Sequence, residues 1–177
     1  MKKLLLLLLI SLGFIGLANA NPNPIDGAFG YKLGLVEKDA ELQEDTSGFK
    51  YKSKSFIPSK VMPPFTSYTI KTTLTKNKIY EITAYVSKIK YDTFSCDQNI
   101  YFKDLLSALK RKYKEHGKLL SFRWNDSMDF TFIIDDRSIV LECEEDYDEM
   151  SMQLTYSDDK LLDMLKKGNN IYSDFDI

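Results

Sequence analysis

The sequence has little of the chemistry that most hydrolases and metal sites use, because its 177 residues include one histidine and two cysteines. A Ser–His or Cys–His mechanism would have to use His116. This residue lies in the last turn of a predicted helix, where the helix dipole favours a cation, and we interpret it as a helix-end residue. One histidine and two distant cysteines do not supply the closely spaced ligands of a zinc site. We therefore expect no metal and no other cofactor, and we assign no catalytic residue.

Basic residues are also few. Arginine occurs only at Arg111, Arg123 and Arg137, which leaves few candidates for planar recognition of anions. Without Lys2 and Lys3 the chain has 22 basic and 26 acidic residues, a net charge of −4. Domains that bind nucleic acid normally carry a basic stripe, so this balance argues against a nucleic-acid partner.

Long apolar runs are missing after the first twenty residues. Within those twenty, Lys2 and Lys3 precede a mostly apolar run over residues 4–17, and residues 18–20 (Ala-Asn-Ala) fit a signal-peptidase site. The run is shorter than the ~20 residues of a membrane-spanning helix. We predict that residues 1–20 are a signal peptide. The mature chain is then expected to have no membrane span and to be periplasmic or secreted, since one signal serves both destinations.

The two cysteines, Cys96 and Cys143, are 47 positions apart and form no C-x-x-C redox motif. An even number of cysteines in an exported chain favours disulfides, and two cysteines permit a single pairing. A loop of this length would stabilise the fold by roughly 4 kcal/mol in the chain-entropy model. We predict a structural disulfide between Cys96 and Cys143, with a reactive thiol or a zinc ligand as the alternative role.

The N-terminal arm, residues 21–48, is interrupted by proline and glycine and then becomes acidic. Its run GAFGYKLG, residues 27–34, has the spacing G-x-x-G-x-x-x-G and no preceding strand, so it matches neither the dinucleotide fingerprint nor a P-loop. We interpret it as a packing segment whose glycines let Phe29, Tyr31 and Leu33 lie against a sheet. The rest of the arm is predicted to form a short helix or a turn.

Alternation of apolar and polar residues predicts strands on both sides of one helical segment. Residues 49–55 form a possible strand. Residues 67–74 and 79–86 are predicted to form a hairpin whose turn contains Asn77, a residue that tolerates the left-handed conformation. Four further strands follow the helix. The residues expected on the apolar faces of these strands are Tyr68, Ile70, Thr72, Leu74, Tyr80, Ile82, Ala84, Val86, Leu120, Phe122, Trp124, Phe130, Phe132, Ile134, Ile139, Leu141, Cys143, Met150, Met152, Leu154 and Tyr156.

The main helix is predicted over residues 96–117. Its apolar residues recur at intervals of three and four, which places them on one stripe. Ser95 or Asp97 is expected to cap its start and Gly117 to close its end. The stripe consists of Phe102, Leu105, Leu106, Leu109 and Tyr113.

These segments predict an α+β fold with residues 49–177 in a single domain. We expect an antiparallel sheet of about six or seven strands, the main amphipathic helix packed on one face, and a short C-terminal helix over about residues 158–167 that stops at Gly168. Cys143 is in phase with the buried face of its strand, and Cys96 starts the helix that should cover that face. The predicted disulfide would therefore join helix to sheet.

Acidic residues concentrate in ECEEDYDE, residues 142–149. The segment lacks the ligand spacing of an EF-hand, and we interpret it as a solvated hairpin tip, with weak calcium binding or a basic partner as alternatives. A second candidate for recognition is an exposed aromatic patch on the first half of the sheet, where tyrosines are frequent. The possible binding surface at the tip consists of Glu144, Glu145, Asp146, Tyr147 and Asp148.

Several segments in order, namely GAFGYKLG, PPFTSYTI, NKIYEI, the helix ending LKRKYKEHG, and SIVLEC, make the chain similar to small exported proteobacterial proteins of uncharacterised function. The motifs that carry this resemblance are hydrophobic and structural. The resemblance implies a helix-on-sheet fold and a cysteine pair, and it carries over no catalytic residue.

Export, one small domain held by a disulfide, and the lack of a catalytic set favour a non-enzymatic binding or accessory protein of the bacterial envelope, with an envelope or host protein as its partner. The alternatives are a small hydrolase that acts on envelope material and a secreted inhibitor of another enzyme. A cleft with two carboxylates of shifted pKa would favour the hydrolase, and an exposed apolar patch would favour binding. The oligomeric state cannot be derived from the sequence.

Overall fold

The computed structural model describes residues 23–38, 42–45, 50–89, 95–124, 126–146 and 149–173. It confirms an α+β fold. The elements in chain order are β1 (Gly27–Ala28), β2 (Tyr31–Lys32), β3 (Gln43–Asp45), β4 (Tyr51–Ser55), β5 (Ser67–Thr72), β6 (Ile79–Ile89), α2 (Ile100–Tyr113), β7 (Lys118–Trp124), β8 (Ser127–Ile134), β9 (Arg137–Asp146), β10 (Glu149–Asp158) and α3 (Asp159–Ser173).

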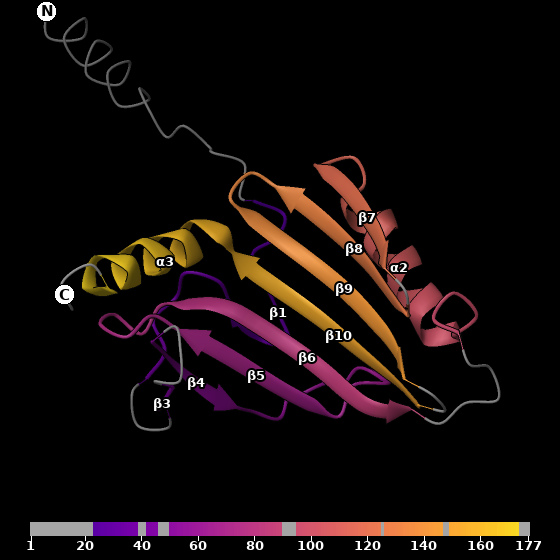
Figure 1. Ribbon diagram of the computed structural model, residues 1–177, viewed down its shortest axis with the longest axis horizontal. Coiled ribbons are helices and arrows are strands. Elements are labelled where there is room, and N and C mark those ends of the chain that lie inside the picture. Colours follow the sequence, from indigo (N-terminus) through magenta and orange to yellow (C-terminus); the bar gives the residue numbers. More distant parts are fainter. Residues whose placement is uncertain are drawn as a thin grey trace, which may run out of the picture.

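Eight strands form one antiparallel sheet in the order β3-β4-β5-β6-β10-β9-β8-β7. The sheet consists of two four-stranded meanders, β3–β6 and β7–β10, whose last strands pair at the centre. Figure 1 shows α2, which connects the meanders, behind β7–β9. The predicted count of six or seven strands was too low. β3 has only three residues, QED, and β1 and β2 have two each, so no apolar alternation could reveal them.

The first part of the N-terminal arm forms the β1–β2 hairpin. The two residues of its turn, Phe29 and Gly30, have φ values of 55° and 94°, as a type I′ turn requires. A Cβ atom on Gly27 would lie 2.1 Å from a carbonyl oxygen of the facing strand. The hairpin packs Phe29 against Tyr68, with ring centroids 5.1 Å apart, and Leu33 is buried. The interpretation of GAFGYKLG as a packing segment is therefore confirmed.

α2 begins after Asn99, whose buried side chain accepts a hydrogen bond from the backbone N–H of Phe102 at 3.1 Å. The predicted caps were therefore wrong. The Ser95 hydroxyl donates instead to the Asp97 carboxylate within the preceding turn. The helix is also shorter than predicted, because it ends before Gly117 is reached.

The apolar stripe of α2 faces the sheet as predicted. Phe102, Leu109 and Tyr113 are buried. The ring of Phe102 lies 5.9 Å from that of Phe130, and the ring of Tyr113 lies 6.3 Å from that of Phe132. The helix thus covers the β8–β9 half of the inner face, and the β1–β2 hairpin covers the β5–β6 half.

The predicted disulfide is confirmed. Cys96 and Cys143 are bonded with a Cα–Cα distance of 6.0 Å, and both are buried. The bond attaches the turn before α2 to the inner face of β9, which is the connection between helix and sheet that the phase of Cys143 predicted.

Substitution of the helix cap should be measurable. We expect Asn99→Ala to lower the free energy of unfolding by about 1 kcal/mol, because the N–H of Phe102 loses its acceptor inside the protein. Urea denaturation followed by circular dichroism measures the change. Gln98→Ala, at an exposed neighbouring position, is the matched control, and equal losses in the two variants would contradict the role of Asn99.

The inward set predicted for β7 was wrong. Leu120 lies opposite Thr131 and Phe122 opposite Asp129, and residues directly opposite one another share a face of the sheet. Leu120 and Phe122 therefore point away from α2, and Phe122 is 61% exposed. The side chain of Trp124 lies outside the described residues. Alternation of apolar and polar residues along an edge strand shows that its two faces differ, but it does not show which face packs against the helix.

α3 begins directly after β10, and the Asp158 carboxylate accepts a hydrogen bond from the backbone N–H of Leu161 at 3.0 Å. The prediction that Gly168 ends this helix was wrong, since α3 continues to Ser173. A glycine inside a helix costs about 1 kcal/mol and does not by itself terminate it. In the part of the chain that the structure describes, no helix has the length and apolar character needed to cross a membrane.

Candidate functional site

The two faces of the large sheet differ in their covering. α2 and the β1–β2 hairpin pack on the inner face, where the apolar core lies. The opposite face is turned towards the viewer in Figure 1, and the strand register gives it mostly polar residues. We call this opposite face, on β6–β10, the open face. Its central residues are Thr83, Tyr85, Leu120, Phe122, Ser127, Asp129, Thr131, Val140, Glu142, Glu144, Ser151, Gln153 and Thr155.

One row across the open face combines aromatic and acidic side chains. The strand register places Asp129 between Phe122 and Glu142. It then places Gln153 between Glu142 and Tyr85. The row thus has one residue on each of the five neighbouring strands β7, β8, β9, β10 and β6. Directly opposite residues have Cβ atoms about 5 Å apart, so each side chain of the row lies beside the next. Phe122 is 61% exposed and Tyr85 is 38% exposed, which leaves an accessible aromatic side chain at each end and two carboxylates between them.

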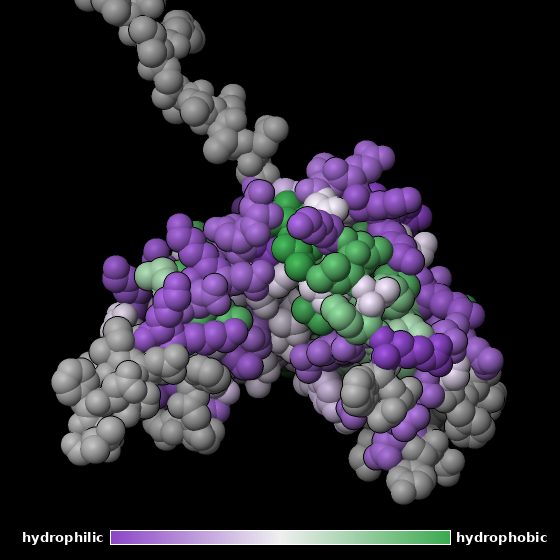
Figure 2. Space-filling view, turned by 45° about the horizontal axis from the view of Figure 1, so that its top comes forward, coloured by the Kyte–Doolittle hydropathy of each residue, from purple (hydrophilic) through white to green (hydrophobic). Residues whose placement is uncertain are grey.

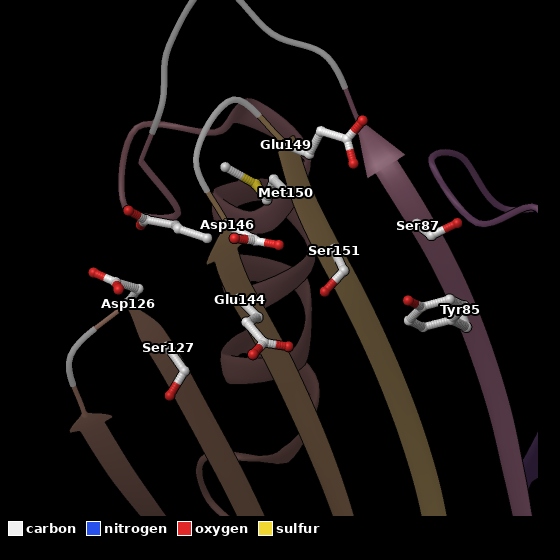
Figure 3. A pocket seen from close by; sticks show the side chains of 10 residues that line it. Tyr85, Ser87, Asp126, Ser127, Glu144, Asp146, Glu149, Met150 and Ser151 are labelled. Atoms are coloured by element: carbon white, nitrogen blue, oxygen red, sulfur yellow. The ribbon is translucent and has the colours of Figure 1, made fainter.

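The open face ends in a hollow of about 560 Å³ beside the β9–β10 hairpin. Figure 3 shows Tyr85 and Ser87 on one side of the hollow, Asp126 and Ser127 on the other, and Glu144 between them. Five of the ten lining residues are acidic, and none of the ten is basic. The lining consists of Tyr85, Ser87, Asp126, Ser127, Glu144, Glu145, Asp146, Glu149, Met150 and Ser151.

The carboxyl groups of the row are held in an environment that disfavours their charge. Burial raises the pKa of Glu142, and the neighbouring charges of Asp129, Glu81 and Glu144 raise it further. Burial also raises the pKa of Asp129. Gln153 Nε2 donates a hydrogen bond to Glu142 Oε2 at 3.0 Å, but this donor is neutral. A cation bound on this face would therefore relieve repulsion that is already present in the fold.

Removal of one of these charges should stabilise the protein in a pH-dependent way. A raised pKa in the folded state means that ionised Glu142 lowers stability at neutral pH, and that this loss disappears as the pH falls below the pKa of the unfolded chain. We expect Glu142→Gln to raise the free energy of unfolding by about 0.5 kcal/mol at pH 7 and to have little effect near pH 3.5.

Urea denaturation at the two pH values measures this difference, and Glu115→Gln at an exposed position is the matched control. An equal gain at both pH values would show that the effect of Glu142→Gln is not electrostatic.

The structure brings together three of the five residues predicted as a binding surface. One of them also has a structural role, because the carboxylate of Glu145 accepts a hydrogen bond from the backbone N–H of Cys96 at 2.6 Å. This bond ties the wall of the hollow to the disulfide. The other two predicted residues, Tyr147 and Asp148, lie outside the described residues. The three that line the hollow are Glu144, Glu145 and Asp146.

The row itself was not predicted. A signal for part of it was present in the turn between β8 and β9, which consists of Asp135 and Asp136. A two-residue turn determines the register of its hairpin, and this register places Asp129 opposite Glu142. Phe122 was missed because β7 was assigned the opposite phase.

Other candidates from the sequence do not contribute to this site. His116 is exposed in the loop between α2 and β7. Among the residues that the structure describes, no group of three or more His, Cys, Asp or Glu side chains could hold a metal ion. The acidic side chains of the hollow are therefore spread along its walls and are not gathered around one point.

No protein-family model matches the chain, and no curated protein or solved structure is significantly similar to it. The chain is thus classified by its architecture alone: an antiparallel sheet with an apolar inner face, attached by a disulfide to the turn before α2, and with an acidic and aromatic open face.

Proposed function

We propose that this protein is an exported, non-enzymatic binding or accessory protein of the bacterial envelope and that it holds its partner on the open face. The observation that carries the proposal is the difference between the two faces of the sheet. The inner face buries a continuous apolar core, while the open face keeps Phe122 and Tyr85 accessible. Aromatic side chains exposed beside polar ones are typical of recognition surfaces.

The rigidity of the open face supports a binding role. Its side chains project from neighbouring strands of one sheet, and the strand β9 is attached to the turn before α2 through the disulfide. A surface built on regular strands loses little conformational entropy when a partner docks, so more of the contact energy contributes to affinity. The disulfide also supports export, because such bonds form and persist in oxidising compartments.

A crosslinking pull-down with the tagged mature protein, from the periplasm and the medium of the bacterium that makes it, tests the binding role. We expect one saturable partner that the heat-denatured, reduced protein does not capture. A secreted inhibitor of another enzyme would be recognised by capture of that enzyme. Absence of any partner above the denatured control would contradict the proposal.

A second candidate function is the small hydrolase, and the pair Asp129 and Glu142 favours it. The two residues lie directly opposite one another, and the pKa of Glu142, which burial and the charge of Asp129 raise, fits the general acid of such a pair. Hydrolysis of purified envelope polymers is the assay. If the pair is catalytic, Glu142→Gln should lower the rate about 100-fold or more, whereas Glu115→Gln should leave it unchanged. No hydrolysis by the unsubstituted protein would exclude this candidate for those polymers.

A further inference from the structure

The two carboxylates of the row, Asp129 and Glu142, have no basic residue among their direct cross-strand neighbours. Two nearby basic side chains are already engaged, since Lys71 pairs with Glu81 at 2.8 Å and Arg123 with Asp97 at 3.4 Å. No ion pair between described residues includes the two carboxylates of the row. The negative charge of the face is therefore available to a positively charged partner.

Apolar side chains flank these carboxylates on the same face. Leu120 is 40% exposed, and the register places it in one row with Thr131 and the half-buried Val140, next to the row that contains Phe122. Figure 2 shows that apolar surface gathers on the side of the molecule formed by β7–β9, with hydrophilic surface around it. A small inorganic cation would not use such side chains, but interface anchors are typically aromatic residues within a polar surround.

We propose that the open face docks a folded protein with a basic surface, whose lysine or arginine side chains contact Glu142 and Glu144 and whose apolar side chains contact Phe122. This inference rests on the proposed binding function and names the class of partner. Charge complementarity selects this occupant. A second copy of the chain would place like carboxylates opposite one another, and an anionic membrane surface would be repelled in the same way.

Site-specific photocrosslinking in the bacterium that makes the protein tests the location. The photoreactive residue p-benzoylphenylalanine replaces Phe122 in one variant and Tyr85 in a second. Matched control variants carry it at Ile57 and Met164, which are 90% and 62% exposed and lie outside the open face. Mass spectrometry identifies both the captured protein and the segment that is crosslinked.

We expect the Phe122 and Tyr85 variants to capture the same protein through a segment of net positive charge. We also expect the capture to be lost at roughly 0.5 M salt, where screening shortens the range of surface charges to a few Å. Capture from Ile57 or Met164 alone would overturn the location of the docking site, but the protein would still have a binding function. A crosslink to a second copy, or to a neutral or acidic segment, would overturn the class of partner. No capture from any of the four positions would overturn the binding function itself.

Affinity measurements with the captured protein then test the charges. We expect the double variant Glu142→Gln/Glu144→Gln to bind roughly tenfold more weakly or worse, because paired charges at interfaces are strongly coupled. Asp104→Asn/Asp163→Asn removes the same charge from exposed positions of the two helices and should change affinity less than about twofold. Phe122→Ala should weaken binding about 30-fold. Equal effects of the two double variants, in proteins with unchanged circular dichroism, would overturn the docking geometry.

Discussion

Replacement of both cysteines, in the double variant Cys96→Ala/Cys143→Ala, is expected to lower the free energy of unfolding by about 4 kcal/mol. The bond closes a loop of 47 residues that contains α2, β7 and β8. Without it, the unfolded chain regains the freedom of this whole loop. The folded state also loses the covalent attachment of the turn before α2 to β9. Because a small domain is stable by only about 5–15 kcal/mol, the variant should be close to unfolding at physiological temperature.

Urea denaturation with and without a reducing agent measures the contribution of the bond. The reducing agent should destabilise the unsubstituted protein to the level of the double variant and should not affect the double variant. A loss below about 1 kcal/mol would contradict the loop argument. Loss of the disulfide should also affect the hollow. The backbone N–H of Cys96 donates a hydrogen bond to Glu145 in the wall of the hollow, so this wall should become less ordered when Cys96 is no longer bonded to β9.

Phe102→Ala is expected to lower the free energy of unfolding by about 3–5 kcal/mol. The side chain is 1% exposed and packs against Phe130, so its removal leaves a cavity between α2 and the sheet. Ile100→Ala, on the same turn of the helix at a position that is 65% exposed, should change stability by no more than about 0.5 kcal/mol. Urea denaturation of both variants under one set of conditions measures the difference.

A smaller variant at the same position tests the cavity explanation. Phe102→Leu keeps most of the apolar volume and should lose much less than Phe102→Ala. If both substitutions at Phe102 cost the same, the ring itself and not the filled volume would be the source of the stability.

Much of the inner face could be predicted from the sequence because burial repeats along the chain with the period of each element. The stripe from Phe102 to Tyr113 has the helical period. Ile139, Leu141 and Cys143 have the strand period, and Cys143 in that phase predicted that the disulfide would join helix to sheet. These residues follow a local rule, so no knowledge of neighbouring strands was needed.

The open face could not be predicted in the same way, because its organisation depends on pairing between strands. Asp129 and Glu142 are thirteen positions apart in the chain, and only the β8–β9 register brings them together. Tyr85 joins the row through β10, which pairs with β6 across more than sixty residues of chain. The error at Phe122 has a related cause. In the edge strand β7, apolar residues on both faces are partly exposed, as Leu119 and Leu120 are, so the sequence pattern does not show which residues point towards the core.

The place of β10 in the sheet also affects how the protein is made. β10 follows every other strand in the chain, yet it lies in the middle of the sheet and pairs with both β6 and β9. The N-terminal meander therefore leaves the ribosome with the edge of β6 unpaired, and this edge stays unpaired until the last strand is made. Closure by such distant segments is intrinsically slow and leaves strand edges exposed to aggregation. A chain of this design depends on protection of the β6 edge during synthesis, and shortening the chain before β10 would leave two half-sheets with no strand to join them.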